Sequence, residues 1–256
     1  MDIKNKVAIV TGGASGLGEA TVRRFASLGA KVTIFDMNEQ RGGALVEELG
    51  SSVLFQRVNV CDEDSVQAGI AATLSAFGGI HICCNFAGVA DAAKTVGKNG
   101  PFPLDTFMKV ININLVGTFN VLRLAAEVMS KQDTLTEDGA RGVIINTASV
   151  AAYEGQVGQA AYSASKGGIV GMTLPIARDL ASLGIRVNTI APGLIHTPMF
   201  DGLSKTVVDS LSASVPNPQR LGRPDEIAHL AQFIVENDYM NGETVRMDGA
   251  IRMQPR

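Results

Sequence analysis

The sequence predicts a single α/β domain in which helices pack on both faces of a doubly wound parallel β-sheet. Short apolar runs alternate with amphipathic stretches along the chain, mostly through short connections. A glycine-rich turn directly follows the first apolar run. The 256 residues include 28 glycines and only 5% aromatics, which suits helices packed on a parallel sheet better than a β-sandwich. No linker, repeat or charge run divides residues 1–256, so one domain is expected.

Four apolar runs in the first half of the chain predict four strands. The helix after the first strand has apolar residues at helical spacing and ends at Gly29. Glycines and prolines between residues 89 and 103 predict a loop. The predicted elements are strand 7–10, glycine turn 11–18, helix 20–28, strand 31–35, helix 38–49, strand 53–60, a helix from about 62, strand 80–84 and loop 89–103.

The second half predicts three more strands. Pro224 followed by Asp225 and Glu226 is typical of a helix start. Periodicity is weak between residues 194 and 223, which predicts a loop over the sheet edge where a substrate would lie. The predicted elements are helix 104–129, loop 130–142, strand 142–147, a helix carrying Tyr162 to about 183, strand 185–190, a short helix 204–211, helix 224–236 and strand 243–247.

The glycine turn has the pattern Thr-Gly-x-x-x-Gly-x-Gly over residues 11–18. Glycines between a strand and a helix let the backbone approach a pyrophosphate at the helix N-terminus. An ordinary strand-to-helix turn also favours glycine, but the three glycines of this pattern, all within seven residues, make that alternative weaker. The spacing differs from the common Gly-x-Gly-x-x-Gly fingerprint. The turn therefore predicts a dinucleotide site.

Asp36 ends the second predicted strand, about 20 residues beyond the glycine turn. A carboxylate at that place accepts hydrogen bonds from adenosine ribose hydroxyls and repels a 2′-phosphate. Met37 adds no positive charge, although Arg41 is near in sequence. Asp36 could instead cap the following helix. Its strand-end position favours the ribose role, and hence NAD over NADP.

Tyr162 and Lys166 stand four residues apart on a predicted helix and so share a face. An ammonium beside a phenol favours the phenolate, so we expect a lowered Tyr162 pKa and a proton-transfer role. Ser149, after a predicted strand, could hold the substrate oxygen. Taken alone, the pair could be incidental on a surface helix. Asn112 and Asn114 lie in the preceding helix, and either could serve a polar relay.

Composition excludes several classes of protein. The formal net charge of −3 gives no general attraction to nucleic acid or to an anionic membrane, and no apolar run is long enough to span a bilayer. Three cysteines and a short, charged N-terminus predict a cytoplasmic protein without a signal or transit peptide. The histidines are too scattered for a metal site or a Ser/His/Asp hydrolase. We therefore expect no metal, nucleic-acid or membrane partner.

Together these motifs resemble the short-chain dehydrogenase/reductase family over essentially the whole chain. The matching pieces are the glycine turn, Asn85-x-Ala87-Gly88, Asn114, Ser149, the Tyr162/Lys166 pair and Pro192-Gly193. The resemblance implies a Rossmann-type seven-stranded sheet ordered 3-2-1-4-5-6-7 and a homotetramer. It further implies a catalytic triad of Ser149, Tyr162 and Lys166, with Asn114 fixing a water that links Lys166 to solvent.

The resemblance also implies cofactor contacts along the chain. Asn59 stands where the family usually has an adenine-binding aspartate, and Phe86 replaces the second asparagine or small residue of Asn-Asn-Ala-Gly. The amide of Asn59 can still accept from the adenine amine. The expected NAD-binding residues are Gly12, Ser15, Gly16, Leu17, Gly18, Asp36, Asn59, Val60, Asn85, Ala87, Gly88, Tyr162, Lys166, Pro192, Gly193, Ile195 and Thr197.

Two segments, residues 141–180 and 248–255, resemble most closely those family members that oxidise 3-hydroxyacyl-CoA esters. Oxidation of a secondary alcohol, with Ser149 and Tyr162 contacting the substrate, is therefore expected. Hydroxysteroid dehydrogenase and 3-oxoacyl-carrier-protein reductase activities share this site, although the second commonly uses NADPH. A non-catalytic NAD-binding scaffold or sensor is the alternative from another class. The loop 194–223 would decide between acyl-CoA and steroid.

Overall fold

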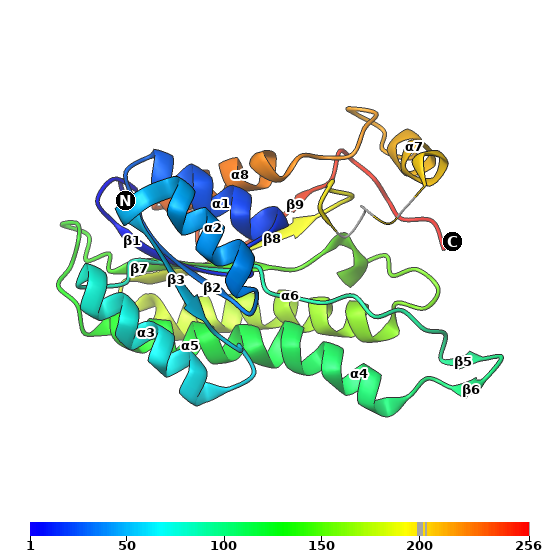
Figure 1. Ribbon diagram of the computed structural model, residues 1–256, viewed down its shortest axis with the longest axis horizontal. Coiled ribbons are helices and arrows are strands. Elements are labelled where there is room, and N and C mark those ends of the chain that lie inside the picture. The colour runs from blue at the N-terminus through cyan, green and yellow to red at the C-terminus, as the bar shows by residue number, and fades with distance from the viewer. Residues whose placement is uncertain (199–201, 203, 256) are drawn as a thin grey trace.

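Seven parallel strands form the central sheet (Figure 1). The computed structural model describes residues 1–198, 202 and 204–255. The strands, in spatial order, are β3 (Val53–Arg57), β2 (Lys31–Asp36), β1 (Val7–Thr11), β4 (Ile82–Asn85), β7 (Gly142–Thr147), β8 (Ile185–Pro192) and β9 (Thr244–Met247). Counted along the chain within the sheet, this is the expected order 3-2-1-4-5-6-7. The Rossmann-type doubly wound fold is confirmed.

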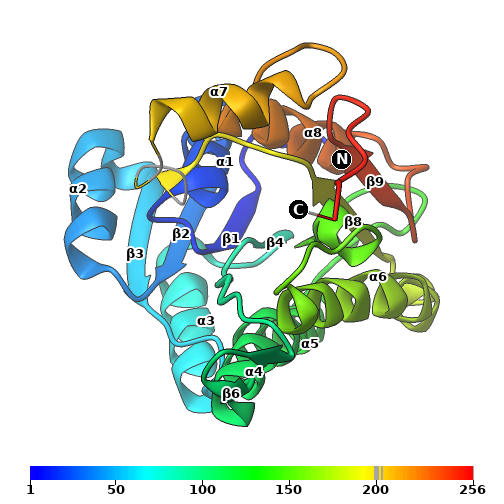
Figure 2. The ribbon, with the colours of Figure 1, turned by 90° about the vertical axis from the view of Figure 1, so that its right-hand side faces the viewer.

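Helices cover both faces of the sheet, as Figures 1 and 2 show from two directions. One face carries α1 (Gly16–Ser27), α2 (Glu39–Leu49) and α8 (Pro224–Glu236). The other face carries α3 (Glu63–Phe77), α5 (Gly117–Ser130) and α6 (Ala160–Ala181). The shorter helices are α4 (Leu104–Ile111) and α7 (Lys205–Ala213). Burial on both faces explains why the strands are continuous apolar runs.

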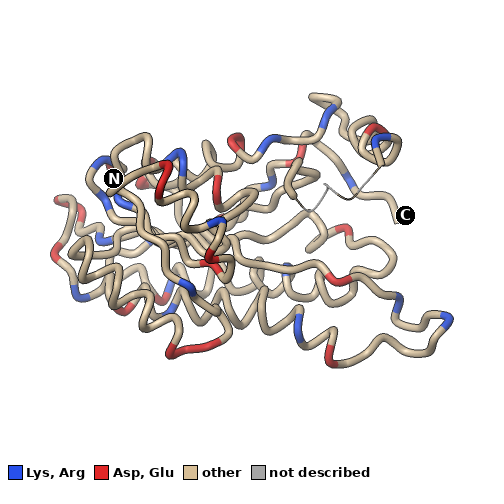
Figure 3. Tube along the Cα trace, viewed as in Figure 1, with Lys and Arg blue, Asp and Glu red and all other residues tan. Residues whose placement is uncertain are grey.

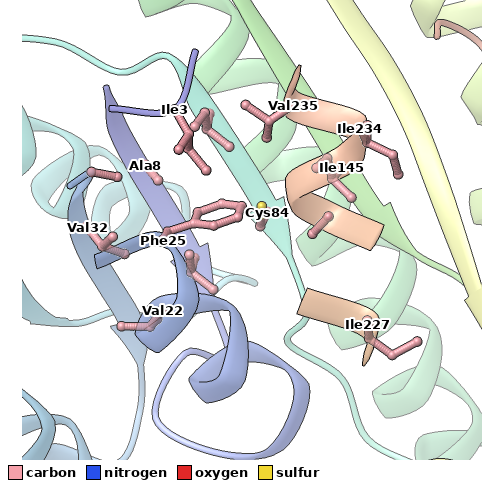
Figure 4. Close-up of a cluster of buried hydrophobic side chains, with 14 of the residues drawn as sticks. Ile3, Ala8, Val22, Phe25, Val32, Cys84, Ile145, Ile227, Ile234 and Val235 are labelled. Carbon is pink, nitrogen blue, oxygen red and sulfur yellow. The ribbon is translucent and has the colours of Figure 1, made fainter. Parts of the chain in front are cut away.

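The alternation of side chains along each strand divides the core into two layers. On β1, Ala8 and Val10 pack under α1 and α8, while Ile9 points into the layer under α3 and α5. Phe25 of α1 is fully buried in the first layer, where Figure 4 shows its ring between the sheet and α8. Each such large apolar side chain contributes roughly 1.5–3 kcal/mol by leaving water.

Several predicted elements differ from the structure in their bounds, most of them by one to four residues, and four differences are larger or affect the site. The helix predicted at 104–129 is interrupted by a π-helical turn, Asn112–Val116, so α4 and α5 are separate. The third strand ends at Arg57 instead of residue 60. A small hairpin, β5 (Val96–Gly97) and β6 (Gly100–Pro101), lies within the predicted loop 89–103. The sixth sheet strand extends to Pro192, beyond the predicted end at 190.

Acidic and basic residues are interspersed along the chain, with no long stretch of one sign (Figure 3). None of the helices in the described part of the chain is both long and apolar enough to cross a bilayer. The predicted helix 204–211 is present as α7, Lys205–Ala213. Part of the loop predicted at 194–223, residues 199–201 and 203, lies outside the described residues.

Candidate active site

A cavity of about 460 Å³ opens at the carboxyl-end edge of the sheet, the edge that Figure 2 faces. It lies where strand order reverses between β1 and β4, the place where open α/β sheets bind ligands. Its volume falls in the range of sites for small molecules and cofactors. The residues around it come from the glycine turn, from the ends of β2 and β3, from the segment after β4, and from α6.

The glycine turn forms one wall of the cavity and fits a pyrophosphate. Gly12 and Gly16 have positive φ values of 64° and 55°, a conformation that favours glycine. A side chain at Gly18 would overlap the backbone of Gly12, so the helix can approach the strand only without one. Ser15 caps α1 without a side-chain hydrogen bond to the helix. The first N–H groups of α1 are therefore left for an anion.

Asp36 is held at the cavity by two backbone hydrogen bonds. Ala14 N–H donates to its Oδ2 at 3.0 Å, and Asn38 N–H donates to its Oδ1 at 2.9 Å. Each carboxylate oxygen keeps a further lone pair, which can accept a hydrogen bond from the hydroxyl groups of a ribose. Asn38, and not Asp36, caps α2 by accepting from Arg41 N–H at 3.0 Å. Among the described residues that line the cavity, Lys166 carries the only positive charge, and Arg41 is not one of them.

Lys166 is nearly inaccessible, with 5% of its surface exposed. Its Nζ donates to the carbonyl oxygen of Thr147 at 2.6 Å. Burial lowers the pKa of Lys166 to about 8. The same Nζ lies 5.8 Å from the centroid of the Tyr162 ring. The expected pair is therefore assembled on one helix face at the cavity.

The Tyr162 side chain is partly buried at the cavity, beside Ser149. Burial raises the Tyr162 pKa, and a hydrogen bond with the Ser149 side chain lowers it in part. This net direction is opposite to the lowered pKa expected from Lys166. Burial sets this direction, and no hydrogen bond from Lys166 opposes it, because the ammonium donates to the Thr147 carbonyl. Ser149 Oγ also accepts from Ala151 N–H at 3.1 Å, which fixes its orientation at the turn after β7.

Asn114 lies in the π-helical turn and is fully buried, whereas Asn112 is exposed. The Oδ1 of Asn114 accepts a hydrogen bond from Val89 N–H at 2.8 Å. Its Nδ2 donates to the Val89 carbonyl at 2.9 Å and to Ser165 Oγ at 3.0 Å. A Cβ at Gly88 would lie 3.2 Å from Asn114 Oδ1 and 3.7 Å from Lys166 Nζ. The absence of a side chain at Gly88 leaves room between these two polar groups.

Most of the expected cofactor residues line this cavity together. Those that do are Gly12, Ser15, Gly16, Leu17, Gly18, Asp36, Asn59, Val60, Ala87, Gly88, Tyr162, Lys166 and Thr197. Four do not. Asn85 is buried in the sheet and donates to Asn146 Oδ1 at 3.0 Å. Pro192 ends β8, Gly193 N–H bonds to the Met247 carbonyl, and Ile195 lines a separate 110 Å³ cavity.

Several lining residues were not expected from the sequence. They are Phe35, Val58, Val89, Ile113, Thr147 and Pro198. Most are chain neighbours of expected residues at strand ends, so extending each predicted site by one position would have found them. Ile113 is likewise the chain neighbour of Asn114, whereas Thr147 lies two positions before Ser149 and had no such signal. Among the described residues, the buried Thr147 hydroxyl has no hydrogen-bond partner, so it could serve a ligand.

Comparison with known proteins agrees with this geometry. Residues 6–207 match the short chain dehydrogenase family. The 3-hydroxyacyl-CoA dehydrogenase type-2 of Rattus norvegicus is 54% identical over 255 residues, covering 99% of this chain and 97% of the relative. The protein of that name from Drosophila melanogaster is 53% identical, over 99% and 100% of the two chains. The chain thus belongs to the short chain dehydrogenase family, whose members are nicotinamide-cofactor-dependent oxidoreductases.

A solved structure of a related enzyme has the same fold as this chain. The crystal structure of 3-hydroxyacyl-CoA dehydrogenase type-2 from Mycobacterium avium superimposes with a TM-score of 0.95 at 44% identity, covering 98% of each chain. A more distant relative, the 3-oxoacyl-[acyl-carrier-protein] reductase of Thermotoga maritima, is 34% identical over 98% of this chain and 99% of its own length.

Proposed function

We propose that this chain is an NAD-dependent dehydrogenase that interconverts 3-hydroxyacyl-CoA and 3-oxoacyl-CoA esters with short or branched acyl chains. The observation that carries the proposal is one continuous cavity. It is lined by the glycine turn and Asp36 at one end and by Tyr162 and Lys166 at the other. The substrate class is supported by the relatives at 53–54% identity, which are named 3-hydroxyacyl-CoA dehydrogenase type-2.

NAD is proposed over NADP because of the charges around Asp36. The carboxylate faces the cavity with lone pairs free, and the neighbouring lining residue is the uncharged Met37. A 2′-phosphate beside Asp36 would meet like charge without a compensating cation. In this proposal Asn59 and Val60 contact the adenine, and the N–H groups that open α1 bind the pyrophosphate.

The chain's own residues supply proton transfer and orientation. A nicotinamide cofactor held by these residues would supply the hydride acceptor for C3 of the substrate. Tyr162 takes the proton of the 3-hydroxyl, and Ser149 donates a hydrogen bond to the same oxygen as it becomes a carbonyl. Lys166 stabilises the phenolate form of Tyr162, which is the form that can accept this proton, because its ammonium lies near the tyrosine ring. Asn114 holds the water through which Lys166 exchanges protons with solvent.

The alternatives differ in substrate or in class. A hydroxysteroid dehydrogenase or a 3-oxoacyl-carrier-protein reductase would use the same proton-transfer residues. The carrier-protein reductase from Thermotoga maritima is less similar, at 34% identity. A non-catalytic NAD-binding scaffold would not need Ser149 bonded to Tyr162 within a buried site. Loop 194–223 is proposed to select the substrate, although residues 199–201 and 203 lie outside the described residues.

The proposal is tested by following NADH absorbance with a panel of 3-hydroxyacyl-CoAs, hydroxysteroids and simple alcohols, using NAD and NADP in parallel. A kcat/KM at least tenfold higher for an acyl-CoA corresponds to about 1.4 kcal/mol of transition-state discrimination. A tenfold preference for a steroid would reassign the substrate. No turnover of any substrate with either cofactor, together with measurable NAD binding, would favour the scaffold.

We also propose that the enzyme is a homotetramer. Apolar side chains such as Phe119 of α5 and Leu183 just after α6 are 46% and 37% exposed and border a shallow depression between these helices. Such a patch is typical of a surface covered by another subunit. Light scattering gives the mass directly, and a monomeric mass would overturn this assignment.

A further inference from the structure

The connection between Ser149 and Tyr162 is anchored by the C-terminal tail, residues 251–255. This connection comprises a 3-10 turn, Val150–Ala152, and an irregular stretch that ends where α6 begins at Ala160. In Figure 2 the tail runs beside this stretch at the carboxyl-end edge of the sheet. The anchoring hydrogen bonds are Val157 N–H to the Pro255 carbonyl at 3.0 Å, Gln156 Nε2 to the Gln254 carbonyl at 2.9 Å, and Met253 N–H to Glu154 Oε2 at 3.4 Å.

Four charged side chains form ion pairs between the tail, β9 and this connection. We call them the C-terminal ion cluster: Glu154, Arg246, Asp248 and Arg252. Arg246 of β9 holds Glu154 in a two-pronged pair, with Nη1–Oε1 at 2.6 Å and Nη2–Oε2 at 3.0 Å. The Nε of Arg246 donates to Asp248 Oδ2 at 2.8 Å. Arg252 reaches Asp248 at 3.1 Å and Glu154 at 3.5 Å. The cluster is electrically balanced, and Arg246 is its centre.

Arg246 and its two carboxylate partners are largely shielded from solvent, which strengthens the ionic hydrogen bonds between them. Its side chain is 21% exposed, that of Glu154 is 23% exposed, and that of Asp248 is 8% exposed. The guanidinium also lies 5.3 Å from the centroid of the Tyr153 ring and donates to the Ile251 carbonyl at 3.0 Å. Arg246 lowers the pKa of Glu154, so the pair stays ionised at neutral pH. A two-pronged arginine–carboxylate pair fixes direction as well as distance.

The same arginine reaches a second segment of the site through Asp248. Gly193, in the turn after β8, packs directly on Asp248, since a Cβ at Gly193 would lie 2.7 Å from its Cα and Cβ. Gly193 N–H also donates to the Met247 carbonyl at 3.0 Å. Arg246 therefore joins two chain segments that come to the same sheet edge. One links Ser149 to Tyr162, and the other is the Pro192–Gly193 turn.

We propose that Arg246 is a positioning residue, which acts through Glu154 to hold the Ser149–Tyr162 connection against the turn after β8. This inference rests on the proposed function. Removing the guanidinium leaves Glu154 and Asp248 as neighbouring carboxylates with only Arg252 between them, and the connection shifts to separate them. Displacements of about 1 Å at reacting groups can cost about 100-fold in rate. The adenosine half of the cavity, around Asp36, is built from other elements and should be unaffected.

The test compares Arg246→Met with a matched control, Arg23→Met, in the full-length enzyme with NAD and 3-hydroxybutyryl-CoA. Arg23 also makes a two-pronged pair, with Glu48 at 2.6 and 2.8 Å, and bonds a second carboxylate, Glu19, at 2.9 Å. It joins α1 to α2 and does not line the cavity. We expect Arg246→Met to lower kcat at least tenfold while KM for NAD stays within threefold. Arg23→Met should leave both constants within twofold.

Two further variants separate positioning from general stability. Glu154→Gln alone, and Glu154→Gln combined with Arg246→Met, should lose as much kcat as Arg246→Met alone, because residues acting through one pair are not additive. Arg246→Lys, which keeps the charge but not the two-pronged geometry, should recover part of the lost kcat. If Arg246→Met does not fold, Arg246→Lys carries the test through a lowered kcat at nearly unchanged Tm.

Distinct outcomes separate this inference from the proposed function. A wild-type enzyme without turnover would refute the proposed function itself. Active wild type with normal kcat in folded Arg246→Met, or in folded Arg246→Lys should Arg246→Met not fold, would overturn the positioning role. The role would also be overturned if light scattering showed that the loss followed a change in subunit number. Equal losses of kcat in Arg246→Met and Arg23→Met would do the same, since they would reflect stability alone.

Discussion

Lys166 Nζ donates a 2.6 Å hydrogen bond to the backbone carbonyl of Thr147. This bond ties α6, which carries the phenol, to the last residue of β7, two positions before Ser149. Because a carbonyl is a neutral partner, the buried ammonium keeps a desolvation penalty, and its pKa falls to about 8. The bond that sets the relative positions of Ser149, Tyr162 and Lys166, the three proposed catalytic residues, thus requires a buried charge that lowers the stability of the fold.

Replacing Lys166 with Met should stabilise the fold at neutral pH while abolishing turnover. The folded pKa of about 8 lies below the ordinary lysine value of 10.5, so the unfolded chain binds more protons between those pH values, and wild-type stability rises with pH across that window. At pH 7 the penalty is on the order of 3 kcal/mol, and loss of the bond to Thr147 offsets about 1 kcal/mol. Urea unfolding should show Lys166→Met more stable by roughly 1–3 kcal/mol at pH 7. Lower stability of the variant at pH 7 would contradict this.

Replacing Tyr162 with Phe should lower kcat by about 100-fold or more, the usual range for a general acid–base group. The ring still fills its place beside the cavity, so NAD binding, measured by isothermal titration calorimetry, should stay within threefold of wild type. Ser149→Ala is the companion variant, since it keeps the phenol but removes its hydrogen-bond partner. Near-normal turnover of Tyr162→Phe would refute the proton-transfer assignment.

Replacing Asp36 with Ala should weaken NAD use and relax the discrimination against NADP. The change removes both the proposed ribose acceptor and the charge that would repel a 2′-phosphate. We expect kcat/KM for NAD to fall 10- to 100-fold, about 1.4–3 kcal/mol, with a smaller fall for NADP. Asp36→Asn is the control, because an amide oxygen can still accept from Ala14 or Asn38 N–H. An unchanged NAD/NADP ratio in Asp36→Ala would exclude the charge argument.

The site could be predicted from sequence where its geometry is local. The four-residue spacing of Tyr162 and Lys166 fixes a shared helix face, and Asp36 follows from the end of an apolar run. The two buried layers of the fold follow equally from strand periodicity. For these features the backbone alone decides where the side chain lies.

The rest depends on contacts between distant segments. Glu154 and Arg246 pair across 92 residues, and no periodicity connects them. Asn114 is turned inward by the π-helical turn, which the helical pattern of 104–129 does not signal. The expected lowering of the Tyr162 pKa was wrong, because burial raises it and Lys166 donates to the Thr147 carbonyl. A backbone carbonyl is present at every position, so the sequence does not show that Lys166 would choose this one. Tertiary packing sets each of these.

Replacing Gly18 with Ala should damage the fold and the cofactor site together. Its Cβ would overlap the carbonyl of Gly12, a backbone group that can move only if α1 moves away from β1. We expect a loss of about 2 kcal/mol or more in unfolding free energy, as for other overpacked sites, and weaker NAD binding in the fraction that folds. Gly43→Ala in α2 is the matched control, because a Cβ there meets nothing within 4 Å. That variant should gain about 0.5–1 kcal/mol from helix propensity with unchanged NAD binding. Equal stability of the two variants in urea would show that the close approach of α1 to the first strand is not required.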